Sequence, residues 1–229
     1  SAARYCQVLA RAESKPVLQL HTYFRSSASF RVRIALNLKG LAYESIPVHL
    51  LAGGGEQLQP QFRALNPMGL VPVLQDESQT LTQSLAIIEY LEELHPEPAL
   101  LGRSAGERAR IRALALDIAC EIHPLNNLRV LNYLVAEFGF TDEQKKRWYR
   151  HWAESGLAAV EATLTQHPGS FCVGDTPSLA DCCLVPQVFN ALRFECNLAH
   201  VPKVVAIHDH CMTIDAFRRA APAAQPDAV

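Results

Sequence analysis

The first hundred residues alternate between two hydrophobic periods. Residues 15–24 are apolar and rich in β-prone side chains, which predicts a buried strand. Apolar side chains at helical spacing predict a helix over residues 28–39, and Gly40 stands where a left-handed residue commonly follows the last turn. Residues 43–50 predict a second strand, in which Pro47 indicates an edge position. The chain therefore begins with a strand that runs directly into a helix.

Shorter elements follow a glycine-rich loop. A short helical turn is expected just before and into residues 66–72, and two short strands are expected over residues 71–76 and 80–82. Ser84 is then expected to cap a helix whose apolar positions are separated by acidic ones. The resulting order, βαβαββα, is that of a thioredoxin-like α/β fold.

Proline and glycine residues between positions 96 and 102 indicate a domain boundary. We expect a thioredoxin-like N-terminal domain over residues 16–96 and an all-α C-terminal domain over residues 103–229. Residues 1–15 are interpreted as a flexible tail, with the remnant of an organellar presequence as the alternative.

The second half of the chain has helical periodicity only. Residues 104–138 predict a long amphipathic helix that should kink or break at Pro124, because proline removes one helical hydrogen bond and crowds the preceding turn. A second long helix is expected over residues 141–167.

The last part of the chain contains a capping-box pattern. Ser178 precedes Asp181 by three residues, at the start of an apolar helix that we expect to be buried. Asp181 is therefore interpreted as structural, so that its loss should impair folding more than chemistry. One further helix and a Pro/Ala-rich tail are expected within residues 203–229.

The composition is that of an ordinary globular protein, with 229 residues, 49% of them hydrophobic, and a formal net charge of −2. No basic excess indicates nucleic acid or an anionic membrane as a partner, and no apolar run reaches the roughly 18–20 residues that span a bilayer. The seven cysteines show neither CxxC nor zinc-like spacing with histidine, so no metal site is expected. A reduced, cytoplasmic protein is the natural interpretation.

The candidate chemistry lies where the first strand meets the first helix. Arg25, Ser26 and Ser27 occupy this junction, where unpaired N–H groups and the positive end of the helix dipole favour an anion. An ordinary N-cap role would explain one of the two serines. No His–Asp pair is identifiable as a base, which disfavours a hydrolase. A hydroxyl that donates to the thiolate of a bound cofactor fits better, and either serine could supply it.

Five motifs together resemble one family of enzymes. They are YFRSSASFRVRIALNLKG, LNPMGLVPVL, TQSLAIIEYLEE, IHPLNNLRVL and GDTPSLADCCLVPQV. Over residues 17–227 the chain is similar to zeta-class glutathione transferases, and within that class to bacterial maleylacetoacetate isomerases. The resemblance implies the glutathione transferase fold, glutathione as the cofactor and a homodimer. One departure is Ala28, where eukaryotic members usually carry a cysteine, so any role of that thiol is absent here.

The resemblance also implies residue roles. Ser26 is the implied thiol-activating hydroxyl, with Ser27 beside it and Arg25 completing the catalytic turn. Glutathione contacts are implied for Ser26, Gln57, Val71, Pro72, Gln83, Ser84, His123 and Asn127, and the Val71–Pro72 bond is expected to be cis. Substrate contacts are expected for Arg25, Asn126 and Arg193. Two arginines suit a diacid, because a guanidinium binds a carboxylate through two parallel hydrogen bonds.

The implied reaction is the cis–trans isomerisation of 4-maleylacetoacetate to 4-fumarylacetoacetate, in tyrosine and phenylalanine breakdown. The glutathione thiolate adds to the cis double bond, the resulting single bond rotates, and elimination gives the trans product. The alternatives are a maleylpyruvate isomerase, a transferase acting on α-halo acids, and a non-catalytic binding protein on the same fold. Related maleylpyruvate isomerases carry an additional arginine at the position of Leu128, which favours the maleylacetoacetate reaction.

Other interpretations are purely structural. Gln83 and Ser84 could form an ordinary helix cap, and Arg193 could be a solvated helix-end cation. Arg31, Arg33 and the run 145–150 are expected on solvated faces. Structural roles are expected for His49, Trp148, Trp152, Cys182 and Cys183.

Overall fold

The computed structural model describes residues 18–228, and all its strands lie in the first half. The elements there are β1 (Leu18–Thr22), α1 (Ser27–Leu38), β2 (Tyr43–Pro47), α2 (Pro60–Leu65), β3 (Val73–Gln75), β4 (Thr80–Thr82) and α3 (Ser84–Leu94). This confirms the predicted βαβαββα order. The expected tail over residues 1–15, and the first residues of the expected first strand, lie outside the described residues.

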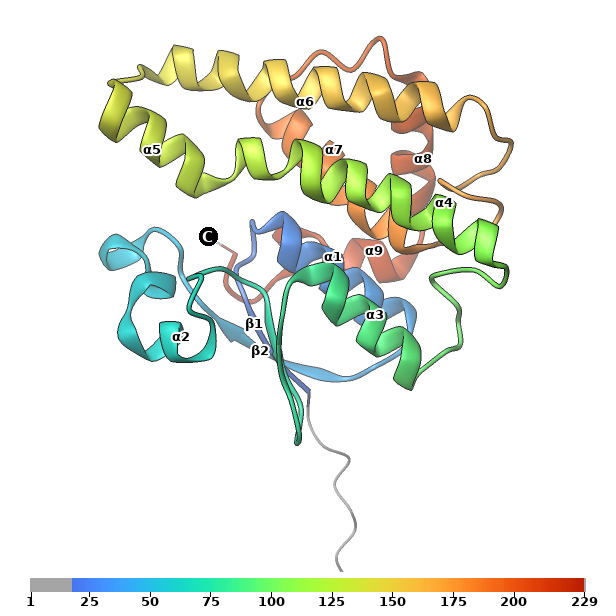
Figure 1. Ribbon diagram of the computed structural model, residues 1–229, viewed down its shortest axis with the longest axis horizontal. Helices are drawn as coiled ribbons and strands as arrows, with labels where there is room; N and C mark the ends of the chain where they lie inside the picture. Colours follow the sequence, from blue (N-terminus) through green and yellow to red (C-terminus); the bar gives the residue numbers. More distant parts are fainter. Residues whose placement is uncertain (1–17, 229) are drawn as a thin grey trace, which may run out of the picture.

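The strands form one mixed sheet in the order β2-β1-β3-β4. Strand β2 pairs in parallel with β1 at the edge, as Pro47 indicated, and the other pairs are antiparallel. Leu20 and Leu74 are cross-strand partners in the main core with α1 and α3. The next pair, His21 and Val73, faces the other side, where Phe62 of α2 packs. Helices α1 and α3 therefore cover one face and α2 the other (Figure 1).

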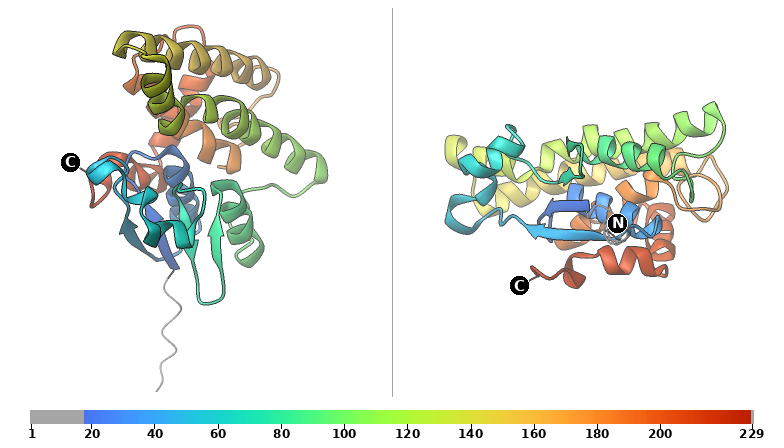
Figure 2. Two further views of the ribbon diagram at one scale, coloured as in Figure 1. Left: turned by 60° about the vertical axis from the view of Figure 1, so that its left-hand side comes forward. Right: turned by 90° about the horizontal axis from the view of Figure 1, so that it is seen from below.

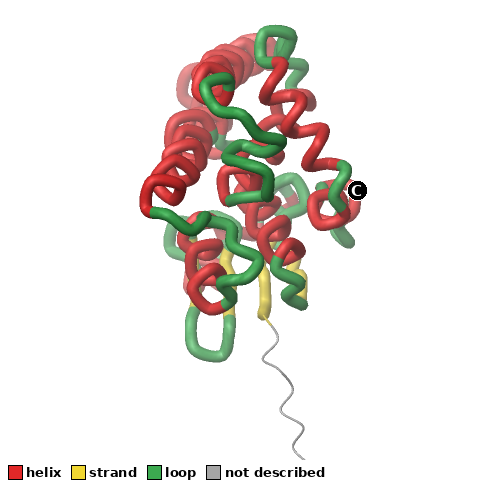
Figure 3. The backbone as a smooth tube through the Cα atoms, turned by 90° about the vertical axis from the view of Figure 1, so that its right-hand side faces the viewer, coloured by secondary structure: helices red, strands yellow, loops and turns green. Residues whose placement is uncertain are grey.

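The second half is helical throughout the described residues. It contains α4 (Ala105–Leu116), α5 (Leu128–Phe138), α6 (Asp142–Leu164), α7 (Leu179–Arg193), α8 (Pro202–Met212) and α9 (Asp215–Ala220). Figure 3 shows the strands gathered at one end of the molecule with these helices stacked beyond them. No helix among the described residues is long and apolar enough to cross a membrane.

The long helix predicted from residue 104 does break at Pro124. A π-helical turn over Asp117–Ile122 and a 3₁₀ turn over Pro124–Asn126 separate α4 from α5. The expectation of a single final helix is wrong. The chain turns after Met212, and α9 folds back against α1 (Figure 2).

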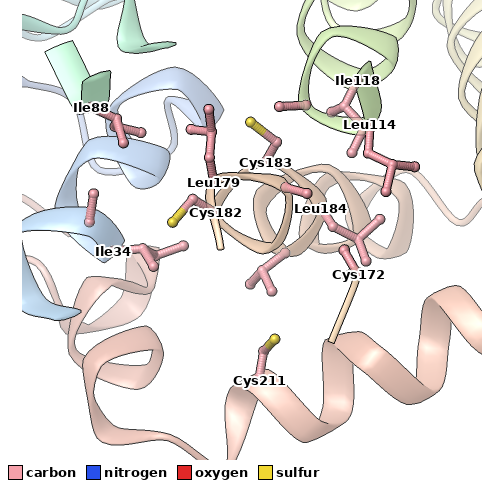
Figure 4. Close-up of a cluster of buried hydrophobic side chains, with 14 of the residues drawn as sticks. Ile34, Ile88, Leu114, Ile118, Cys172, Leu179, Cys182, Cys183, Leu184 and Cys211 are labelled. Carbon is pink, nitrogen blue, oxygen red and sulfur yellow. The ribbon is translucent and has the colours of Figure 1, made fainter. Parts of the chain in front are cut away.

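Helix α7 occupies the centre of the core. Its predicted capping box is present, and the Asp181 carboxylate has no exposed surface. This carboxylate accepts hydrogen bonds from the backbone N–H groups of Cys172 and Ser178, each at 2.8 Å. Cys182 and Cys183 are buried in the same cluster, between α1 and α4 (Figure 4). Burial raises the pKa of both thiols, so they remain protonated and act as small core residues.

The structure corrects expectations about two arginines of α1, one residue of the run 145–150 and the cap of α3. Arg31 and Arg33 are 3% and 0% exposed, because α1 is enclosed by α3, α7 and α9 and has no solvated face there. The run 145–150 is solvated at Lys146 and Arg147, as expected, but Tyr149 within it is buried and stacks on Phe194. The cap of α3 is Gln83, while Ser84 is the first helical residue.

Candidate active site

The turn between β1 and α1 presents the Ser26 hydroxyl at a cavity. The Ser26 N–H donates to the Tyr23 carbonyl at 2.9 Å, and the Ser26 Oγ accepts the N–H of Ser29 at 3.2 Å. Ser26 is therefore the N-cap of α1, as the structural interpretation predicted. A hydroxyl that accepts a hydrogen bond keeps its own O–H for donation. The capping role thus leaves one donor on this half-buried side chain.

Ser27 is placed differently. It is 6% exposed, and its Oγ accepts a hydrogen bond from the Asn190 side-chain amide of α7. Its hydroxyl therefore takes part in the contact between the two halves of the chain. Its own O–H also remains free to donate, but Ser27 is nearly buried whereas Ser26 is half-buried, so exposure favours Ser26 as the donor to a bound anion.

One cavity of about 760 Å³ brings the expected site residues together. Its lining includes all of Arg25, Ser26, Ser27, Gln57, Val71, Pro72, Gln83, Ser84, His123, Asn126, Asn127 and Arg193. They come from the turn before α1, the segments before α2 and β3, the starts of α1 and α3, the break after α4, and the end of α7. Both the sheet-bearing half and the helical half of the chain therefore line this cavity.

The wall near α3 is built from unusual backbone. The Val71–Pro72 bond is cis, as expected. Gln83 has φ 70° and ψ 113°, a conformation that residues other than glycine rarely adopt. It places Ser84 at the first position of α3, where unpaired N–H groups and the positive end of the helix dipole attract a carboxylate.

Arg31 is the site residue that the sequence interpretation missed. Its Nη1 donates to the Ser84 Oγ at 3.3 Å, and its Nη2 lies 3.1 Å from the Nδ1 of His123. Its buried Nε has no hydrogen-bond partner among the described residues. Arg31 follows Ser27 by four residues, so both lie on one helix face. That spacing is the signal by which it could have been found.

The His123 ring has a defined tautomer. Arginine has no acceptor, so the Nδ1 that faces Arg31 must accept, and a neutral ring carries its hydrogen on Nε2. The Asn127 Nδ2 lies 3.3 Å from this Nε2, while the Asn127 oxygen already accepts the N–H of Arg129. Two N–H donors therefore stand side by side on the cavity wall. This arrangement suits an acceptor oxygen of a bound molecule.

The neutral state of His123 has a consequence for stability. Burial, with the nearby charges of Arg31 and Arg129, lowers the pKa of His123 to about 3. In the unfolded chain its pKa is about 6.5, so between these values only the unfolded state takes up the proton. We expect this residue to reduce the free energy of unfolding by about 1–2 kcal/mol between pH 7 and pH 5.

Urea unfolding of the protein and of His123→Gln at both pH values measures this effect. The glutamine variant should lose less stability on acidification, while all other titrating groups remain common to both proteins. Equal losses in the two proteins would contradict the prediction.

Arg25 and Arg193 lie near the mouth of the cavity. The Arg25 guanidinium lies 4.7 Å from the ring centre of Phe24, and that of Arg193 lies 4.9 Å from the ring centre of Phe194. Burial lowers the pKa of Arg193, and the positive charge of Arg25 acts in the same direction. The two guanidinium groups repel each other, and each is stabilised by the aromatic ring on which it lies. A carboxylate bound between the two arginines would relieve their repulsion.

The cavity as a whole is strongly cationic. Its lining contains the five arginines 25, 31, 63, 129 and 193, and no aspartate or glutamate of the described chain. Asn126 is 8% exposed, donates to the Tyr149 carbonyl at 3.4 Å, and has a side-chain oxygen without a partner in the described structure. Such a site suits ligands with several negative charges and additional amide or hydroxyl groups.

Known proteins resemble this chain over most of its length. Residues 20–99 match the family described as "Glutathione S-transferase, N-terminal domain". A "Probable maleylacetoacetate isomerase" of Vibrio cholerae is 52% identical to it, over 92% of this chain and 98% of that protein.

Two solved structures are also similar. One is the holo structure of a bacterial maleyl pyruvate isomerase, a zeta-class glutathione S-transferase, with 50% identity and a TM-score of 0.89 over 92% of this chain and 100% of that one. The other is a maleylacetoacetate isomerase from Anaeromyxobacter dehalogenans with glutathione bound in its active site. Its identity is 43% and its TM-score 0.85, over 94% of this chain and 99% of that one.

Proposed function

Because the chain belongs to the zeta class of glutathione transferases, we propose that it is a glutathione-dependent isomerase that converts 4-maleylacetoacetate to 4-fumarylacetoacetate. One observation carries the proposal. The cavity beside the Ser26 hydroxyl is lined by five arginines and by no acidic side chain of the described residues. Glutathione and a diacid substrate together carry four carboxylates, which would offset much of this charge.

The residues of the cavity fit glutathione. Its γ-glutamyl carboxylate suits the N-terminus of α3 at Gln83 and Ser84, with Arg31 behind them. The backbone of Val71, before the cis Pro72, is free to pair with an extended peptide. Gln57, whose buried Oε1 has no partner among the described residues, and the N–H groups of His123 and Asn127 offer further polar contacts.

Glutathione supplies a sulfur nucleophile that adds reversibly to the double bond. The residues of the chain activate this sulfur, hold the substrate and stabilise the charge that develops. The Ser26 O–H donates to the sulfur and lowers its pKa, since a hydrogen bond to the charged form favours that form. Arg25 and Arg193 hold the substrate carboxylates, and the Asn126 amide orients the diketone chain. The cationic lining stabilises the negative charge that develops on the substrate during addition.

A direct assay tests the proposal. Maleylacetoacetate and maleylpyruvate would be offered in parallel, with and without glutathione, and the cis–trans conversion would be followed. Glutathione-dependent turnover with a higher kcat/KM for maleylacetoacetate is expected. A preference for maleylpyruvate would favour the second candidate, which is supported by the similarity to the maleyl pyruvate isomerase structure. No turnover of either compound would refute the proposal.

Replacing Arg193 by alanine should raise the KM for the diacid about 10- to 100-fold, the value of a charge-assisted pair of about 1.5–3 kcal/mol. The KM for glutathione should change little, because Arg193 belongs to α7, whereas the proposed contacts for the γ-glutamyl carboxylate belong to α3. Steady-state kinetics with each substrate varied in turn measures both constants. Arg147→Ala, which removes an exposed arginine outside the cavity, is the matched control. Equal effects on the two KM values would contradict the clamp role.

We also propose the roles of the two domains, the oligomeric state, the cellular location and the pathway. Residues 16–96 form the glutathione-binding domain, and residues 103–229 form the domain that contributes the substrate site. A homodimer is supported by an apolar groove between α3 and α4 that includes Leu85 and Leu116. The six cysteines of the described residues are free thiols, which fits a reducing cytoplasm. The reaction would serve tyrosine and phenylalanine breakdown.

A further inference from the structure

The catalytic turn is held from behind by a fully buried arginine. Arg33 of α1 donates from Nη2 to the Phe24 carbonyl at 3.0 Å and from Nη1 to the Thr22 hydroxyl at 2.9 Å. Its Nε donates to the Ala220 carbonyl at the end of α9, also at 2.9 Å. One guanidinium therefore connects Thr22, at the end of β1, and Phe24, immediately before Arg25, to the end of α9, which lies nearly two hundred residues further along the chain.

The charge of Arg33 has little direct compensation. Every hydrogen-bond acceptor around it is neutral. Burial lowers the pKa of Arg33 to about 10, an effect that Tyr43 and Asp227 partly oppose. Asp227 is thus the carboxylate that offsets this buried charge.

Residues 222–228, which we call the strap, bring Asp227 to the same place. The Asp227 Oδ2 accepts the backbone N–H of Phe24 at 2.9 Å. The strap is anchored by Gln225, whose Nε2 donates to the carbonyls of Arg219 and Ala221 at 2.8 and 2.9 Å. Ala228 packs on the apolar cluster that contains Tyr23 and Phe24. The end of the described chain accordingly lies beside the start of α1 (Figure 1).

Phe24 is therefore fixed on both sides of its peptide unit. Its N–H is held by Asp227 and its carbonyl by Arg33, while its ring lies beneath the guanidinium of Arg25. Two residues later the chain reaches Ser26, whose own N–H is held by the Tyr23 carbonyl. A shift of Phe24 would move both the hydroxyl and the guanidinium that face the cavity.

We propose that Arg33 and Asp227 are positioning residues, and that the strap must be docked for the Phe24–Ser26 turn to present its hydroxyl to the glutathione sulfur. The inference rests on the proposed role of Ser26. It adds that activation of the thiol depends on a segment that does not itself line the cavity. A strap that only stabilised the fold would leave the thiol unaffected in the folded protein.

Titration of bound glutathione separates these two roles. The ultraviolet absorbance of the thiolate is followed against pH in the protein, in Asp227→Ala and in Asp227→Asn, each saturated with glutathione. Loss of the carboxylate in Asp227→Ala should raise the thiol pKa by about one unit, a tenfold loss of thiolate at neutral pH. Asp227→Asn retains a neutral acceptor for the Phe24 N–H, so its shift should be about half as large. The matched control is Asp215→Asn, an exposed carboxylate of α9 that pairs only with Arg218 and Arg219.

The outcomes are decisive. A raised thiol pKa in the Asp227 variants, with the control unchanged, supports the positioning role. An unchanged thiol pKa in folded Asp227→Ala overturns it, whatever its melting temperature. If Asp227→Ala does not fold, the same criterion applies to Asp227→Asn.

The titration needs no diacid substrate, so it is independent of the isomerase assay. If the protein binds glutathione and lowers its thiol pKa but does not isomerise, only the proposed reaction fails. If the unmodified protein leaves the thiol at its free value, the role of Ser26 fails, and this inference fails with it.

Discussion

Replacing Ser26 by alanine is expected to reduce the rate at neutral pH about 10- to 100-fold. The variant loses the more exposed of the two serine hydroxyls that line the cavity, and a hydrogen bond to a charged group contributes about 1.5–3 kcal/mol. The bound thiol should titrate closer to its free pKa, so part of the activity should return at higher pH. The pH dependence of kcat/KM measures this directly.

Ser27→Ala is the discriminating companion variant. The Ser27 Oγ is committed to Asn190, so its loss should weaken the packing of α1 on α7 more than the chemistry. Loss of the Ser26 N-cap costs about 1 kcal/mol of stability, so both variants should remain folded. A larger rate loss in Ser27→Ala than in Ser26→Ala would exchange the roles of the two serines. Full activity in both would refute a serine donor at this turn.

Replacing Asp181 by alanine should lower the free energy of unfolding by about 2–6 kcal/mol, the largest stability effect that we expect. The change leaves the buried N–H groups of Cys172 and Ser178 without their acceptor, at about 1–3 kcal/mol each. It also removes the N3 carboxylate of the capping box at the start of α7, around which the core is built. Chemical denaturation followed by circular dichroism measures the loss.

The control for this prediction is Asp209→Ala. The Asp209 side chain is 70% exposed and contacts only the neighbouring His208, so its loss should remain within about 0.5 kcal/mol. Asp181→Asn should fall between the two, because an amide has one acceptor oxygen where the carboxylate has two. If Asp181→Ala were as stable as the control, the capping interpretation of this residue would be wrong. Activity per folded molecule should be little affected, because Asp181 does not line the cavity.

The local features of the fold were predictable because neighbouring residues decide them. The order of elements along the first half, the break at Pro124 and the capping box at Ser178 all depend on backbone chemistry within a few positions. The same holds for the strand-to-helix junction at Ser26, where a helix start leaves unpaired N–H groups whatever lies further away. The turn after Met212 was missed because no proline or glycine marks it, and α9 is held by its packing on α1.

Local patterns did not predict the burial of Arg31 and Arg33. A charged side chain in a helix is solvated unless partners from elsewhere accept its hydrogen bonds. The four-residue spacing from Ser27 places Arg31 on the face of the candidate site, but no local pattern identifies the partners of either arginine. The partners of Arg31 are Ser84 and His123, from α3 and from the break after α4. The partners of Arg33 lie in β1 and at the end of α9.

The sequence alone thus determined most of the elements, several of their caps and the strand-to-helix junction at Ser26, because hydrogen bonds and hydrophobic periods act over a few residues. Tertiary structure decided which of two adjacent serines is the more exposed at the cavity. It also decided which arginines are buried and that Asp227 holds the turn from behind. These outcomes depend on contacts between residues as far apart as Phe24 and Asp227, and such contacts exist only after the chain has folded.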